Sequence, residues 1–116
     1  MVKPAMVRCI SRMEAFAEKF RAALSRREVA IRDFYDIDHG VKKLGIQPAN
    51  ADLIGLVKKK LSIPGNDPVN VSESRLASLR QQLEPQLKPV LRAADFAQFD
   101  LGRAFKTVAQ MAARVR

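Results

Sequence analysis

The sequence predicts a mainly α fold, a compact bundle of about five helices with one short strand near the N-terminus, in a single domain spanning residues 1–116. Two observations predict it. Apolar residues recur along most of the chain at the three- and four-residue spacing of one helix face. Pro, Gly and Asn gather in short turns between these amphipathic segments. A chain of 116 residues is long enough for one hydrophobic core and offers no room for a second domain.

The N-terminal part predicts a strand followed by a helix. Residues 7–10 (Val-Arg-Cys-Ile) are β-branched or apolar without a helical period, which is typical of a short strand. Ser11 and Glu14 follow at the spacing of a capping box. Behind this cap an apolar stripe predicts a helix over residues 12–27. Because a lone strand leaves its edges unpaired, we expect it to pair with another copy of the chain or to complete the sheet of a larger protein.

Two further helices follow. Residues 30–44 predict a helix with an apolar face, ended by Gly45 as the residue after the C-cap. Residues 51–61 predict the next helix, with Asn50 as its N-cap and three lysines in its last turn. The apolar stripes of the first two helices predict one shared core, formed by Met13, Phe16, Phe20, Phe34, Ile37 and Val41.

The C-terminal half predicts two more helices around a break. Ser72 is placed to cap a helix that carries leucines at helical spacing. Pro85 and Pro89 then predict an extended or single-turn connection, because proline lacks the amide hydrogen that a helix interior needs. The last helix is predicted to begin near Asp95 and to continue through Ala112.

Composition narrows the function classes. No apolar run approaches the roughly 18 residues of a spanning helix, so the sequence excludes a membrane span. One cysteine (Cys9) and one histidine (His39) exclude an internal disulfide and a His/Cys zinc site, which fits the cytoplasm. A net charge of +9 favours polyanionic partners such as RNA, DNA or nucleotide phosphates. A merely solvated basic surface is the alternative explanation for the charge.

The ionisable residues on the first two helices form the candidate site. Lys19 lies about 80° from the centre of its apolar stripe, at the margin of the core. Asp33 lies at the edge of the next helix's apolar face, and Asp36 shares a face with Arg32. If the two helices pack antiparallel, Lys19 and Asp33 can approach each other, while Asp36 lies a turn further on and more toward solvent. The alternatives are a snorkelling surface lysine and a purely structural Arg32–Asp36 pair.

The chain offers no metal site of its own. Asp36 and Asp38 resemble the Asp-x-Asp pair that binds magnesium on a strand, but on a helix their carboxylates diverge by about 200°. The sequence has no G-x-x-x-x-G-K-[ST], G-x-G-x-x-G or G-x-S-x-G motif.

Two segments carry a family resemblance. Residues 10–19 (Ile-Ser-Arg-Met-Glu-Ala-Phe-Ala-Glu-Lys) with Arg21-Ala-Ala-Leu24 and Arg26, and then residues 31–37 (Ile-Arg-Asp-Phe-Tyr-Asp-Ile), resemble the later motifs of AbiEii/AbiGii-type nucleotidyltransferases. These are the toxins of type IV toxin–antitoxin systems, with a polymerase-β-like fold. The match is best over residues 7–45, and the rest of the chain is similar to the family's helical C-terminal region.

The resemblance implies an enzyme that uses an NTP and magnesium to modify an acceptor, in some relatives the end of an RNA. It implies that Lys19 holds the triphosphate, that Asp33 or Asp36 completes the active site, and that Arg32 orients them. The family's Gly-Ser loop and its strand-borne Asp-x-Asp precede this region and are absent from the sequence. We therefore expect a C-terminal portion that is inactive alone, with a missing N-terminal half or an antitoxin as partner.

Two alternatives of other classes stay open. The first is a basic helical module that binds RNA or DNA without catalysis. The second is a protein-interaction subunit, including a homo-oligomer paired through the N-terminal strand. An upstream Gly-Ser/Asp-x-Asp reading frame would discriminate between them and the enzyme portion.

Overall fold

The computed structural model describes residues 12–115, and the secondary structure of this part is helical throughout. The predicted strand at residues 7–10 and Ser11 of the predicted cap lie outside the described residues. The helices are α2 (Arg12–Ser25), α3 (Ile31–Lys43), α4 (Ala51–Leu61), α5 (Glu73–Gln82), the π turn η1 (Leu83–Leu87), the 3₁₀ turn η2 (Lys88–Val90), α6 (Ala93–Gln98) and α7 (Leu101–Arg114). The prediction of a mainly α fold is confirmed.

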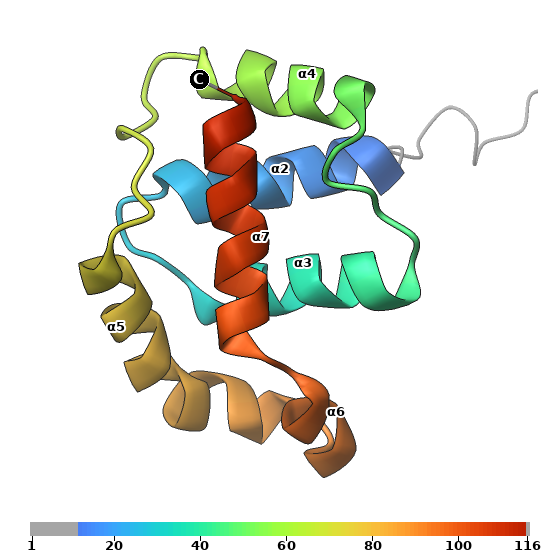
Figure 1. Cartoon of the computed structure of the whole chain (residues 1–116). Coiled ribbons are helices and arrows are strands. Elements are labelled where there is room, and N and C mark those ends of the chain that lie inside the picture. The colour runs from blue at the N-terminus through green and yellow to red at the C-terminus, as the bar shows by residue number, and fades with distance from the viewer. Residues whose placement is uncertain (1–11, 116) are drawn as a thin grey trace, which may run out of the picture.

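The helices pack around α2. Helices α2 and α3 run antiparallel, α4 lies on the other side of α2, and α7 crosses α2 and α3 steeply (Figure 1). Helix α5 and its continuation lie below this group and contact α3 through η1 (Figure 1). Among the described helices, none is long and apolar enough to cross a membrane.

The core lies where α2, α3 and α7 meet. Phe20, Phe34 and Ile37 are each 0% exposed, which confirms their predicted place in one core. Met13, Phe16 and Val41 are only partly buried. The start of α2 and the end of α3 carry these three residues, and the two ends meet because the helices are antiparallel. The predicted core is therefore correct for the middle of the helix pair, and Met13 packs against it while partly exposed, whereas Phe16 and Val41 lie outside it.

One glycine sets the distance between α2 and α3. A Cβ atom at Gly40 would come within 2.5 Å of Phe16 Cζ. Only a residue without a side chain therefore lets the Phe16 ring lie against the α3 backbone. Gly45 has a φ of +73° and follows the C-cap Leu44, as predicted.

Local capping signals predicted helix starts well. Helix α4 begins and ends where predicted, and Asn50 Oδ1 accepts from the amides of Asp52 (2.8 Å) and Leu53 (3.1 Å). Ser72 Oγ accepts from the Arg75 amide at 3.3 Å and begins α5, also as predicted.

Helix α2 ends at Ser25, two residues before the predicted end. Tertiary partners take the carbonyl groups of its last turn. The Asn70 amide donates to Leu24 O at 2.8 Å, and Arg75 Nη2 donates to Ala23 O at 2.8 Å. These groups satisfy acceptors that would otherwise lack partners at a helix end.

The predicted single-turn connection is found at Pro89, in η2, where Leu91 then continues as extended backbone, but the predictions of a break at Pro85 and of an unbroken last helix are wrong. Pro85 does not break the helix, because the backbone widens into η1, where the Lys88 amide donates to Leu83 O. A wider turn relieves the clash that proline makes in an α-helix. The predicted last helix is split into α6 and α7 at Phe99, whose backbone is extended. Asp100 then caps α7 by accepting from the Arg103 amide at 3.0 Å.

Candidate functional site

Lys19 stands at the centre of the candidate site. Its side chain is 39% exposed on α2, at the margin of the core as predicted. The Nζ atom lies 2.8 Å from Asp36 Oδ2 and 3.9 Å from Asp33 Oδ1, both on α3. The structure therefore brings together the lysine and both aspartates that the sequence singled out.

Asp36 lies closer to the lysine than expected. Its side chain is 27% exposed, so it is partly covered rather than turned to solvent. In the part of the chain that the structure describes, Arg32 does not pair with the two aspartates that the resemblance implies it orients. It is exposed, and among residues 12–115 the structure has no ion pair between Arg32 and either Asp33 or Asp36. The alternative of a structural Arg32–Asp36 pair is therefore wrong, because Lys19 takes that position.

Arg26 belongs to the family motif in the sequence but was not predicted to take part in the site. Its Nη1 atom lies 3.4 Å from Asp33 Oδ2, just beyond the end of α2. Arg26 follows Lys19 by seven residues, which is close to two helical turns. That spacing places Lys19 and Arg26 on the side of α2 that faces α3. The sequence alone could therefore have indicated Arg26 as a second cation of the site.

Asp33 is largely buried beside three charged side chains. Its side chain is only 10% exposed. Burial raises the pKa of Asp33 above its ordinary value, and the positive charges of Lys19 and Arg26 offset this effect only in part. The negative charge of Asp36 raises the same pKa further. The fold therefore carries this charge at a cost in stability.

The substitution Asp33→Asn is expected to raise the thermal midpoint of the chain near neutral pH. Because the pKa of Asp33 is higher in the folded than in the unfolded state, its charged form is disfavoured by folding and stability falls as pH rises through the folded pKa. The neutral amide avoids this loss. Below the unfolded pKa both forms are neutral, so the gain over wild type should vanish in acid. Thermal melts of both proteins across pH 3–7 measure this, and a variant less stable at pH 7 than wild type would contradict it.

Asp38 has a structural role apart from the site. Its side chain is 5% exposed and accepts from Arg103 Nε at 2.8 Å and Nη2 at 2.9 Å. This two-point ion pair joins α3 to α7. Asp36 faces Lys19 on α2 instead, so the two carboxylates diverge as predicted for a helix.

The donor set of the site suits a phosphate better than a metal. The half-exposed ammonium of Lys19 can contact a phosphate oxygen. The two aspartates already face the cations Lys19 and Arg26, which repel a divalent ion at the same oxygens. Within residues 12–115, no group of three or more His, Cys, Asp or Glu side chains is placed to hold a metal. Magnesium therefore does not fit these residues alone.

The chain was compared with protein-family models, with curated proteins and with solved structures. Searches of curated proteins and of solved structures gave no match to the chain. The family model described as nucleotidyl transferase AbiEii toxin, type IV toxin–antitoxin system, matches residues 2–111. The match includes both helices that carry Lys19, Asp33 and Asp36. The chain therefore belongs to the AbiEii family of nucleotidyl transferase toxins.

Proposed function

We propose that the chain is the helical C-terminal portion of an AbiEii nucleotidyltransferase and contributes Lys19, Asp33 and Asp36 to its active site. The observation that carries the proposal is the convergence of these side chains, with Lys19 Nζ 2.8 Å from Asp36 and 3.9 Å from Asp33. They come from two separate motifs and meet on one partly exposed edge of the α2–α3 pair. Lys19 faces two aspartates of the next helix, so the ammonium is held across the α2–α3 pair and not within one helix.

In this proposal Lys19 is the residue that binds the nucleotide triphosphate. Asp36 holds the ammonium in place before the nucleotide arrives, and a phosphate oxygen then takes one of the three donor positions of that ammonium. Asp33 keeps the lysine close to α3 from the other side and is itself fixed by Arg26. A lysine positioned in advance loses little side-chain entropy on binding. Magnesium would supply further charge neutralisation in a complete enzyme, with ligands from residues other than these.

The acceptor and the partner belong to the same proposal. RNA is the acceptor class that the net charge of +9 favours, because phosphate backbones attract basic proteins. The partners would be an N-terminal nucleotidyltransferase half, an antitoxin, or a second copy joined through residues 7–10. The single cysteine fits a cytoplasmic setting. The non-catalytic alternative, a basic module that binds nucleic acid or a protein, is favoured only by the charge.

Alone, the chain is expected to transfer no nucleotide. The sequence contains neither a Gly-Ser loop nor a strand-borne Asp-x-Asp, and phosphoryl transfer depends on metal ions held by such carboxylates. Incubation with radiolabelled NTPs, magnesium and total tRNA should give incorporation no higher than a reaction without protein.

A fusion tests the positive side of the proposal. The N-terminal half of a close relative, joined upstream of this chain, should label tRNA or another acceptor under the same conditions. Robust incorporation by the chain alone would contradict its role as a portion of an enzyme. A well-folded fusion that stays inactive while the intact relative is active would favour the non-catalytic alternative.

A further inference from the structure

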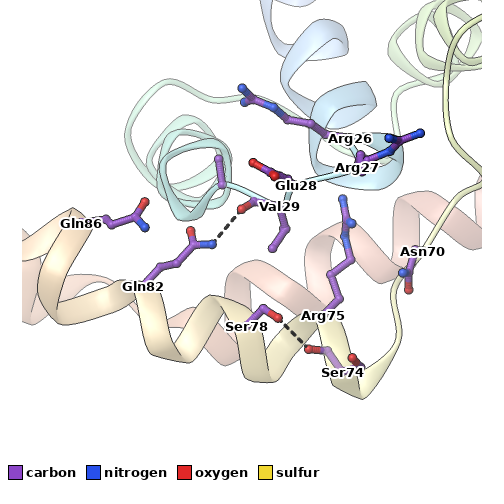
Figure 2. A pocket seen from close by; sticks show the side chains of 11 residues that line it. Arg26, Arg27, Glu28, Val29, Asn70, Ser74, Arg75, Ser78, Gln82 and Gln86 are labelled. Atoms are coloured by element: carbon purple, nitrogen blue, oxygen red, sulfur yellow. Dashed lines mark hydrogen bonds between the residues drawn. The ribbon is translucent and has the colours of Figure 1, made fainter.

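A polar hollow lies between the α2–α3 connection and α5. It measures about 640 Å³ and is lined on one side by residues 26–30 and on the other by α5 (Figure 2). Three arginines line it: Arg26, Arg27 and Arg75. The opposite wall is a polar stripe at four-residue spacing, formed by Ser74, Ser78, Gln82 and Gln86.

Arg75 is the most unusual group in this hollow. The residue is 7% exposed, and its side chain points from α5 toward the end of α2 (Figure 2). Its Nη2 atom donates to Ala23 O at 2.8 Å, whereas its Nε atom is buried and has no hydrogen-bond partner among residues 12–115. No carboxylate of the described chain forms an ion pair with it. A buried cation without an anionic partner is costly, and an anion in the hollow would compensate it.

The other two arginines of the hollow each face a carboxylate. Arg26 is engaged with Asp33 at 3.4 Å, and Arg27 lies 3.4 Å from Asp67 at the rim. Glu28 is the acidic residue in the lining of the hollow itself. Burial lowers the pKa of Arg75, and the charge of Asp67 opposes this effect only in part. The charge of Arg75 is therefore the least compensated of the three.

The donors suit a phosphate group. Guanidinium groups present planar pairs of N–H donors that match two phosphate oxygens. Gln82 Nε2 keeps a second N–H for a phosphate oxygen, and the Ser78 hydroxyl, which donates to Ser74 O at 3.2 Å, can turn to donate to a phosphate oxygen instead. Gln82 is held in place because its Nε2 donates to Val29 O at 2.8 Å and its Oε1 accepts from the Ile31 amide at 2.8 Å.

We propose that this hollow, called here the Arg75 pocket and lined by the three arginines and the polar stripe of α5 and η1, binds a phosphate group. The group is either free, as in a polyphosphate, or part of a nucleic-acid backbone. The pocket adjoins the candidate site because Arg26 lines it and also contacts Asp33. The proposal does not depend on the chain being catalytic, since it uses binding alone.

Titration of the full chain with inorganic phosphate, pyrophosphate and a short single-stranded RNA tests the pocket. Amide resonances of Ser74, Ser78 and Gln82 should shift and saturate. A response to phosphate or pyrophosphate identifies a free group as sufficient, and a response to RNA alone identifies the backbone as the source.

Ser78→Asp is the decisive variant, because it places a carboxylate beside Arg75 in the pocket. Binding should weaken about tenfold or more through like-charge repulsion, while the thermal midpoint is kept or raised by the new ion pair. Ala77→Asp adds the same charge on an exposed position of α5 that does not line the pocket, so it should leave the affinity within about twofold of wild type. Equal weakening by both variants, or no saturable binding of any of the three probes, would overturn the proposal.

Discussion

Replacing Phe20 with Ala is expected to lower the free energy of unfolding by about 3–5 kcal/mol. Phe20 is 0% exposed on α2, the helix that packs against α3, α4 and α7. Removing the ring leaves a cavity bounded by several helices, which cannot all move inward at once. The loss combines the transfer energy of the ring with the cost of that cavity. In a domain of this size the thermal midpoint should fall by at least about 10 °C.

A phenylalanine at the edge of the fold is the matched control. Phe96 on α6 is only partly buried, so Phe96→Ala removes the same ring while leaving less of a cavity. It should cost about 1 kcal/mol. Denaturant unfolding of wild type and both variants, monitored by circular dichroism, gives the three free energies. A Phe20→Ala midpoint equal to that of wild type would contradict the placement of this helix at the centre of the core.

Lys19→Ala is expected to reduce nucleotidyl transfer by about 100-fold or more in the proposed fusion with the N-terminal half of a relative, since single charge-stabilising donors contribute that much in enzyme active sites. The fold should be nearly unaffected. The Lys19 side chain is 39% exposed, and ion pairs at such positions contribute at most about 1 kcal/mol. A large loss of activity with a small change in stability separates a functional residue from a structural one.

Lys59→Ala provides the control, because Lys59 is exposed in the last turn of α4 and takes no part in the candidate site. It should keep the activity of the fusion within about twofold, as expected for a surface change. Lys19→Arg preserves the charge but alters its shape and reach, and should restore only part of the activity. Full activity of the Lys19→Ala fusion would reduce Lys19 to a snorkelling surface residue.

The features predicted correctly from the sequence depend on neighbouring residues. Asn50 and Ser72 cap helices because each accepts from an amide within the next three residues. Gly45 follows α3 in a conformation that depends on its own φ angle. Lys19 and Asp33 were placed at the helix margins by their angular positions alone. Local chemistry decides each of these features.

The features that were mispredicted depend on residues distant in the chain. Helix α2 ends at Ser25 because Asn70 and Arg75 supply donors to its last carbonyls. The last helix is interrupted at Phe99, whose ring packs against Tyr35 with centroids 5.6 Å apart. The sequence does not single out Arg75, because the group that it contacts, the Ala23 carbonyl at the end of α2, lies far away in the chain. Partners far away in sequence cannot be read from periodicity.

The crossing of α7 over α3 has a consequence for synthesis on the ribosome. The Phe105 ring stacks on Phe34 with centroids 6.0 Å apart, and Arg103 neutralises Asp38. Translation delivers α2 and α3 before α7, and their inner face meets water until α7 has been made. A nascent chain stopped before α7 displays apolar surface, the feature by which chaperones and proteases select their clients, and leaves Asp38 without Arg103. Interrupted translation should therefore yield a fragment that is degraded rather than a stable α2–α3 pair presenting Lys19.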